Sequence, residues 1–242
     1  MPCAELEDWP ARFGLVAGIT ERGGGTPPFS LALKSPDESA ETILTRLRAF
    51  REALGPRGFT AFQVAHQCHG VRVAWHEGVA PGFHLLDDTD GHASRQGGLL
   101  LMVSVADCVP IYLAAPGGEA FALLHAGWRG AAAGMLEAGL AVLGERAGVA
   151  ARDVAMHCGV AICGKCYEVG PEVIGAVEGR AATGPKRLDL RAALARRARE
   201  AGVRDVTISP YCTSCDRDRF FSHRASRGDG GRQLAFLGRP RT

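Results

Sequence analysis

Two stretches decide the architecture of this chain: Ser104-Val-Ala-Asp-Cys-Val-Pro-Ile-Tyr112 and, a short way along, Leu124-His-Ala-Gly-Trp-Arg-Gly130. In each, an apolar and β-compatible run ends at a chemically versatile side chain, Asp107 and Cys108 in the first and His125 in the second. Such residues at the ends of buried strands are typical of sites in α/β proteins, because the strand fixes their position and the loop exposes them. The alternative is structural, since a buried cysteine also packs as a small apolar residue. The turn-forming residues that follow each stretch favour a site.

Composition restricts the class of protein. The chain has 242 residues, 46% of them hydrophobic, and a formal net charge of +2. This charge is too small to favour nucleic acid or an anionic membrane as a partner. No apolar run approaches the roughly 20 residues needed to cross a bilayer. Residues 1–12 are acidic and contain no apolar core segment, so they do not resemble a secretory signal and we expect a cytoplasmic protein. Eight cysteines in a reducing compartment favour metal ligands, nucleophiles or core residues over a disulfide scaffold.

The order of apolar runs and turn signals predicts one α/β (α+β) domain. Predicted strands lie at 13–19, 29–33, 62–65, 71–75, 99–105, 120–124, 154–158, 205–208 and 233–237. One predicted helix starts at Ser35 and Pro36 and ends at Gly55. Further helices are predicted at 131–146, 171–177 and 189–201. Residues 78–98 are predicted to form one long polar loop. We expect residues 1–12 to be an N-terminal extension and residues 13–242 to form the single domain.

Three residues at predicted junctions between strand and loop form a candidate metal site: His69, Cys108 and His125. Two imidazoles and one thiolate are a good ligand set for Zn²⁺ and leave a fourth tetrahedral position for water or substrate. Zinc would hold Cys108 as a thiolate and lower the pKa of a bound water. Spacing alone does not fix this grouping, because the sequence contains no H-E-x-x-H or similar zinc signature.

The sequence resembles the YfiH/laccase-domain family, formerly called multicopper polyphenol oxidases. The motifs that carry the resemblance are Gln67-x-His69-Gly70, Ala106-Asp-Cys-Val-Pro110, His125-Ala-Gly-Trp-Arg-Gly130, Cys166-Tyr-Glu-Val-Gly170 and Phe221-Ser-His-Arg224 followed by Gly231-Arg-Gln233. The resemblance implies a zinc-dependent purine nucleoside phosphorylase with adenosine deaminase activity, with His69, Cys108 and His125 as the zinc ligands. It also implies a layered α/β/β/α fold with two stacked sheets. The substrates would be adenosine, inosine, guanosine or methylthioadenosine, together with phosphate.

A mechanism for this chemistry suggests roles for further residues. Arg129, at the start of a predicted helix, and Arg224 are candidates to bind phosphate. Trp128 is a candidate to stack on the base, although an aromatic residue at a helix start is more often part of the core. His223 is expected to lie in the pocket. Cys108, Asp107 and His125 are the candidate catalytic residues. Asp107, next to Cys108, would orient a ligand or carry a proton, with capping of local backbone as the alternative.

Other functions compete with this interpretation. Copper fits less well than zinc, because a polyphenol oxidase needs further coppers held by His-x-His pairs and the sequence has no such pair. A Cys–His hydrolase or amidase acting in peptidoglycan precursor editing would use Cys108 as nucleophile and His125 as base. A non-enzymatic zinc module is the third alternative. The sequence leaves open the oligomeric state, the preferred nucleoside and the activity that dominates in the cell.

Two C-x-x-C pairs stand apart from this site, at Cys163–Cys166 and Cys212–Cys215. Their separation far exceeds the roughly 15–20 residues of a zinc ribbon. We therefore expect unlinked core or loop thiols, with a second structural metal site or a redox pair as the alternatives.

Overall fold

The computed structural model of the chain describes residues 2–23, 30, 39–228 and 230–241. Two six-stranded sheets form its centre. The strands of the first sheet, in spatial order, are β1 (Cys3–Glu5), β2 (Val16–Thr20), β14 (Gln233–Gly238), β7 (Leu99–Val105), β3 (Ala61–His66) and β5 (Gly82–Asp87). Those of the second are β13 (Asp205–Ile208), β10 (Ala155–Cys158), β8 (Val109–Ala114), β9 (Phe121–Ala126), β6 (Gly91–Ser94) and β4 (Val73–His76). The short strands β11 (Glu168–Val169) and β12 (Lys186–Arg187) pair with each other.

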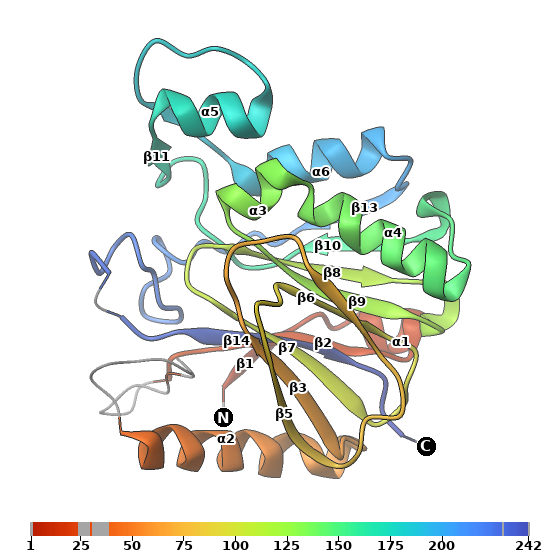
Figure 1. Cartoon of the computed structure of the whole chain (residues 1–242). Helices are drawn as coiled ribbons and strands as arrows, with labels where there is room; N and C mark the ends of the chain where they lie inside the picture. The colour runs from red at the N-terminus through yellow and green to blue at the C-terminus, as the bar shows by residue number, and fades with distance from the viewer. Residues whose placement is uncertain (1, 24–29, 31–38, 229, 242) are drawn as a thin grey trace.

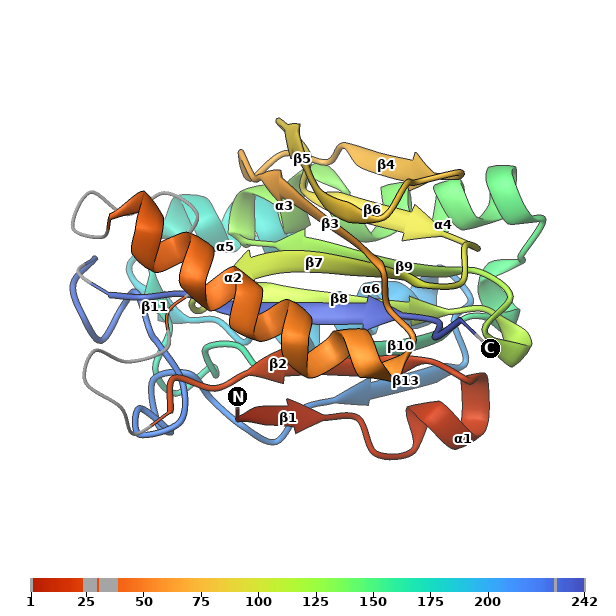
Figure 2. The same ribbon diagram turned by 90° about the horizontal axis from the view of Figure 1, so that it is seen from below.

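Four helices cover the outer faces of the sheets (Figure 1): α2 (Ala40–Leu54), α3 (Trp128–Ala133), α4 (Met135–Ala147) and α6 (Leu190–Glu200). Helix α1 (Trp9–Phe13) packs its Trp9 into the layer between the sheets, and α5 (Pro171–Glu178) packs against α3 and α6. Figure 1 shows α2 below the first sheet and α3, α4 and α6 above the second, and Figure 2 shows α2 lying diagonally across its sheet. The predicted α/β/β/α layering is therefore confirmed (Figure 1).

The central strand β7 is apolar at almost every position because both of its faces are buried. Leu99 and Leu101 point into the layer between the two sheets, whereas Leu100 and Met102 pack with Phe50 of α2. Burying one such side chain stabilises the fold by about 1.5–3 kcal/mol. The continuous apolar run at 99–105 thus places this strand in the middle of the first sheet.

Strand β9 of the second sheet has the same two-sided burial. Leu123 faces the layer between the sheets, and Leu124 faces the helices that cover the second sheet. A polar bond also crosses the layer between the sheets, since the buried Tyr112 hydroxyl donates to the Gly18 carbonyl at 2.8 Å. The two sheets therefore form one unit, and the ends of β3, β7 and β9 have fixed relative positions.

The predicted long loop at 78–98 is wrong, because this segment contains β5 and β6. Strand β5 is an edge strand with alternating exposure, so half of its side chains are polar or solvent-facing. Strand β6 is fully buried but consists of Gly-His-Ala-Ser, which lacks the large apolar residues that signal a strand.

The predicted helix at 131–146 is two helices, because Gly134 has a left-handed backbone with φ of 98° between α3 and α4. The predicted first strand also begins later than expected. Its first residue, Phe13, ends α1, and Gly14 at φ of 62° turns the chain into β2. In both places a single glycine interrupts a pattern of apolar residues that continues on either side.

Two predicted features fall on residues 24–29 and 31–38, which lie outside the described residues. One is most of the predicted strand at 29–33, and the other is the predicted helix start at Ser35 and Pro36. The described helix α2 begins at Ala40, and the side chain of Ser39 caps it by accepting a bond from the Thr42 amide at 3.2 Å.

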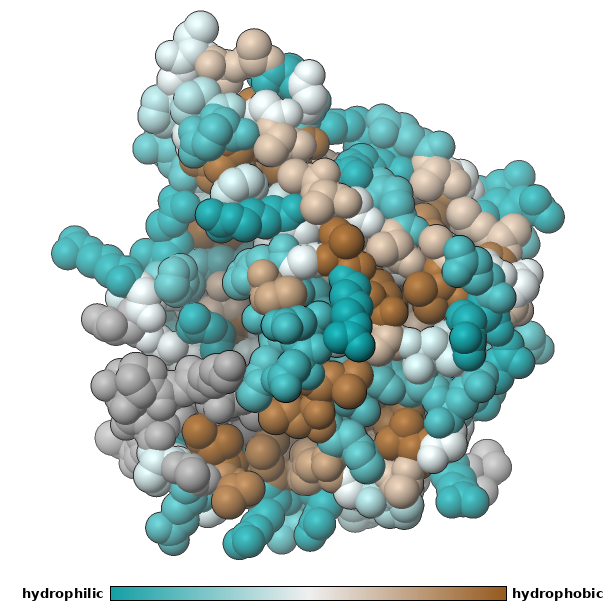
Figure 3. All heavy atoms as spheres, in the orientation of Figure 1, coloured by the Kyte–Doolittle hydropathy of each residue, from teal (hydrophilic) through white to brown (hydrophobic). Residues whose placement is uncertain are grey.

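The first twelve residues contain β1, which pairs antiparallel with β2 at the edge of the first sheet. The domain boundary at residue 13 stays a prediction. Among the described residues, no helix is long and apolar enough to cross a membrane. On the face seen in Figure 3, hydrophobic residues lie in separate groups between hydrophilic side chains.

Candidate metal centre

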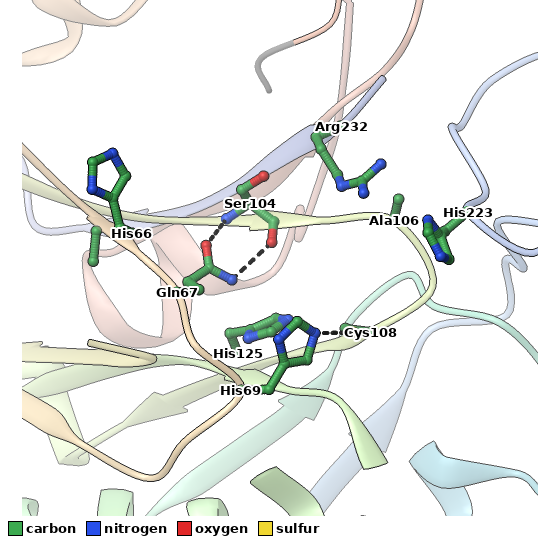
Figure 4. A pocket seen from close by; sticks show the side chains of 10 residues that line it. His66, Gln67, His69, Ser104, Ala106, Cys108, His125, His223 and Arg232 are labelled. Atoms are coloured by element: carbon green, nitrogen blue, oxygen red, sulfur yellow. Dashed lines mark hydrogen bonds between the residues drawn. The ribbon is translucent and has the colours of Figure 1, made fainter. Parts of the chain in front are cut away.

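The structure brings together the three side chains that the sequence analysis grouped as metal ligands. His69 lies in the loop after β3, Cys108 lies between β7 and β8, and His125 belongs to β9. One donor atom from each lies within 4.8 Å of the other two. The Cys108 Sγ is 3.9 Å from the His69 Nε2, and the two imidazole ring centres are 4.9 Å apart. Figure 4 shows the three side chains converging.

The backbone around these residues is shaped for close approach. His69 has a φ of 61° and Asp107 a φ of 84°, both in the left-handed region that costs non-glycine residues of order 1 kcal/mol or more. A Cβ on Gly127 would lie 2.9 Å from the His69 Cδ2 and 3.1 Å from the Cys108 Sγ. Glycine at position 127 therefore allows β9 and α3 to pass directly beside the donor atoms.

The buried carboxylate of Asp90 holds two of the ligands in place. One oxygen accepts a hydrogen bond from the His125 Nδ1 at 2.8 Å and from the His69 amide at 2.9 Å. The other accepts from the amides of Cys68 and Gly70 at 3.0 and 2.9 Å, and from the Cys68 thiol at 3.2 Å. With its Nδ1 bound in this way, His125 presents its Nε2 toward the donor cluster, as metal-binding histidines commonly do.

The sequence analysis missed Asp90. It belongs to the acidic run Asp87-Asp-Thr-Asp-Gly91, and nothing in that run distinguishes it from the two exposed aspartates Asp87 and Asp88. The signal that separates them is burial, which depends on β6 lying beside β9.

The electrostatics of the site favour a deprotonated sulfur. Burial alone would raise the pKa of the Cys108 thiol, but the nearby His125 and His69 outweigh burial and bring that pKa to about 6. Burial would likewise lower the pKa of His125, yet the Cys108 sulfur and the Asp90 carboxylate raise it to about 9. For Asp90, burial is opposed by bonds from His125, Cys68 and the Gly70 amide, which hold the pKa of the carboxyl well below its usual range.

The donor cluster opens into a cavity of about 320 Å³. The described residues that line it are Ala65, His66, Gln67, His69, Ser104, Ala106, Cys108, His125, His223 and Arg232. Gln67 shapes the wall by bonding the backbone of Ser104 twice, at 2.7 and 2.9 Å. Figure 4 shows Arg232 and His223 across the cavity from the two ligand imidazoles.

Only one of the four predicted substrate-binding residues, His223, is among those that line this cavity. Arg129 is exposed, and its guanidinium lies over the Trp128 ring at 4.3 Å. Arg224 donates to the Glu168 carbonyl at 2.8 Å and lies over the Tyr167 ring. Arg232, which lies in the motif Gly231-Arg-Gln233, also lines the cavity, and its residue type alone does not distinguish it from the other arginines.

Asp107 is placed to hold loops together. Its carboxylate accepts from the Thr213 hydroxyl at 2.6 Å and from the Arg224 amide at 2.7 Å. Its carbonyl accepts from the Ile162 amide at 3.1 Å. Thr213 and Arg224, the two partners of the carboxylate, lie far along the chain, so the carboxylate does not cap local backbone. It fixes the strained turn that presents Cys108.

The donor set fits a metal ion such as Zn²⁺. One sulfur and two imidazole nitrogens supply three positions of a tetrahedron, and the fourth position faces the cavity rather than another protein ligand. The glycine at position 127 leaves the space beside the donors that a Cβ would occupy.

The chain is similar to several known proteins. The sequence profile described as multi-copper polyphenol oxidoreductase laccase matches residues 16–240. Purine nucleoside phosphorylase YlmD of Geobacillus stearothermophilus is 31% identical over 93% of this chain and 90% of its own. Its crystal structure superposes with a TM-score of 0.85 at 30% identity, covering 96% of this chain and 94% of that one.

Two further proteins are similar. The crystal structure of Bacillus licheniformis YfiH, titled a hypothetical protein, has a TM-score of 0.86 at 26% identity over 98% of this chain and 96% of its own. A protein named adenosine deaminase RL5, from an unknown prokaryotic organism, is 35% identical over 61% of each chain.

Asp90→Asn tests whether this carboxylate supports the metal ligands. The amide replaces one acceptor oxygen by a donor that faces backbone N–H groups. We therefore expect the affinity for Zn²⁺ to fall by about 10- to 100-fold. A chelator competition titration measures this fall. Asp88→Asn, the same change at an exposed position two residues away, should leave the affinity unchanged. Equal affinities for both variants would show that Asp90 does not position His125.

The metal affinity should also depend on pH. In the metal-free protein the pKa of Cys108 is lowered to about 6 and that of His125 is raised to about 9, so between these values His125 has a proton to lose before the ion can bind. The loss of this proton should raise the apparent affinity about tenfold per pH unit from pH 6 to 9, and the rise should level off above pH 9. Below pH 6 the slope should steepen as Cys108 also becomes protonated. Titration calorimetry in buffers of different ionisation enthalpy counts the released proton, and a flat profile would contradict this assignment.

Proposed function

The chain belongs to the multi-copper polyphenol oxidoreductase laccase family, and from that premise we propose that it is a zinc-dependent purine nucleoside phosphorylase that also deaminates adenosine. The observation that carries the proposal is the convergence of His69, Cys108 and His125 at the floor of a cavity. The names of the relatives YlmD and RL5 support the two activities. The proposed substrates are adenosine, inosine, guanosine and methylthioadenosine, with phosphate as the second substrate.

Zinc suits this donor set better than copper. Polyphenol oxidation needs several coppers, and the sequence contains no His-x-His pair to hold the additional ions. Among the described residues, no other group of potential metal ligands contains a histidine. When bound by these three side chains, zinc supplies Lewis-acid chemistry at the floor of the cavity.

The cavity itself supports nucleoside binding. Its volume of about 320 Å³ lies at the lower end of the range of small-molecule sites, which suits a ligand the size of a nucleoside. Phosphorolysis forms a bond from a phosphate oxygen to C1′ of the ribose and breaks the bond from C1′ to the purine nitrogen. The chain must therefore hold an anion beside the sugar and provide a proton to the departing base.

Arg232 and His223 are assigned these two tasks. The Arg232 guanidinium reaches the cavity wall opposite the ligand imidazoles, where its planar donors match phosphate oxygens. One of its nitrogens bonds the carbonyls of Gly230 and Gly231 at 3.0 and 3.1 Å, which holds the side chain in place. His223 lines the same wall, and we assign it the proton that the purine takes up.

Incubation of the purified protein with adenosine or inosine, with and without phosphate, tests the proposal. We expect free base and ribose 1-phosphate only when phosphate is present, and inosine from adenosine in either case. Chromatography separates all of these products. Removing the metal with a chelator should abolish both activities, and Zn²⁺ should restore them. If neither nucleoside is converted by the zinc-loaded protein, the proposal is wrong.

One observation favours a second candidate, a Cys–His hydrolase or amidase that edits peptidoglycan precursors. Asp90, His125 and Cys108 are connected in the order that orients a base and activates a thiolate, and the metal-free pKa of Cys108 is low. A bound zinc would occupy both the thiolate and the imidazole. Amide hydrolysis that survives metal removal would therefore favour this second function.

Arg232→Gln tests the phosphate site. Loss of a charge-assisted bond of about 1.5–3 kcal/mol should raise the KM for phosphate by about tenfold or more and change the KM for the nucleoside little. The matched control is Arg224→Gln, since that guanidinium lies against the Glu168 carbonyl and the Tyr167 ring. If Arg224→Gln raises the KM for phosphate and Arg232→Gln does not, the phosphate role belongs to Arg224.

A further inference from the structure

Four cysteines that the site above does not use lie together on another part of the fold. Cys163 and Cys166 belong to the segment between β10 and β11, and Cys212 and Cys215 follow β13. Although members of the two pairs are 49 residues apart in sequence, all four sulfurs lie within 4.8 Å of one another. The four cysteines are free thiols, as expected, but their convergence favours the alternative of a second metal site.

The two C-x-x-C turns have the same local geometry. In the first turn, the amide of Tyr167, four residues after Cys163, donates to the Cys163 carbonyl at 3.1 Å. In the second turn, the amide of Asp216, four residues after Cys212, donates to the Cys212 carbonyl at 2.9 Å. Each backbone turn therefore brings its two cysteines to the same side of the chain, where the four sulfurs meet.

The two turns also bind each other. The Cys163 amide donates to the Cys212 sulfur at 3.2 Å, and the Thr213 amide donates to the Ala161 carbonyl at 3.2 Å. Asp216 closes the second turn by accepting from the Cys212 amide at 2.8 Å. The backbone thus holds the four sulfurs in one group, without relying on any bond between the sulfurs.

The spacing of the sulfurs distinguishes a metal site from a pair of disulfides. The Cys166 and Cys215 sulfurs are 3.5 Å apart, whereas a disulfide bond is about 2.05 Å long. In a tetrahedral site with metal–sulfur bonds of about 2.3 Å, the sulfurs are separated by about 3.8 Å. Four thiolates with no open position are the ligand set of a structural zinc ion.

We propose that Cys163, Cys166, Cys212 and Cys215 bind a second, structural Zn²⁺ ion. This site does not depend on the proposed enzymatic function. The ion would join the segment that carries Ile162 to the segment that carries Thr213, and both of these residues bond to Asp107. The structural ion would therefore hold together the two segments that bond to Asp107, and Asp107 is part of the strained turn that presents Cys108.

Metal analysis of the full-length protein, purified under reducing conditions, tests the proposal. We expect two zinc ions per chain in the wild type. Cys215→Ser and Cys166→Ser should each retain one, and Cys3→Ser, a thiol outside both clusters, should retain two. His125→Ala should also retain one ion, held by the four cysteines. This count is independent of any activity, so failure of the phosphorylase proposal would not alter it.

A second measurement does not depend on whether the cysteine variants fold. Replacement of zinc by Co²⁺ in wild type and in His125→Ala should give, in both, the intense sulfur-to-cobalt absorption of a four-thiolate site. A single zinc ion in the wild type that is lost in His125→Ala would overturn the proposal. So would iron in place of zinc at the four cysteines, or disulfides linking them in freshly purified reduced protein.

Discussion

The bond network of one buried carboxylate, Asp90, determines much of this structure. An isolated carboxylate without solvent costs several kcal/mol, and here three backbone amides and an imidazole offset that cost. The amides belong to the loop after β3, and the imidazole belongs to β9. Because Asp90 directly precedes β6, which pairs with β9, the same bonds that satisfy the charge also bring His69 beside His125. The geometry of the candidate metal ligands is therefore part of how the second sheet packs against the loop from the first.

The layered fold was predictable where burial leaves a pattern in the sequence. The run at 99–105 is apolar because both faces of β7 are covered, and that composition is visible without a structure. Strands β5 and β6 were not predictable in this way. One lies at an edge with alternate side chains in solvent, and the other is buried but built of small residues. The break at Gly134 was also invisible, because the apolar spacing continues through it while the backbone reverses its φ.

The candidate site was predictable to the same extent and for a related reason. Cys108 and His125 stand out because they end apolar runs, so their chemistry contrasts with their surroundings. Asp90 does not stand out, since its neighbours in sequence are also acidic and only the three-dimensional packing buries it. Arg232 is one of many arginines, and what distinguishes it is that it directly precedes β14 and lines the cavity. The sequence can point to candidate ligands. The residues that bond those ligands and the residues that line the cavity depend on which segments meet in the fold.

Asp107 connects the two sulfur-containing sites. Its φ of 84° stores strain that persists only when the surroundings determine the conformation strongly. The bonds that determine it come from Ile162 and Thr213, each of which directly adjoins a cysteine of the four-sulfur cluster. The two segments already bond each other through the amides of Cys163 and Thr213, although ordering each loop residue costs about 1–2 kcal/mol. The proposed ion would add a second link between the same loops, so that a closed sulfur site would support the turn that presents Cys108.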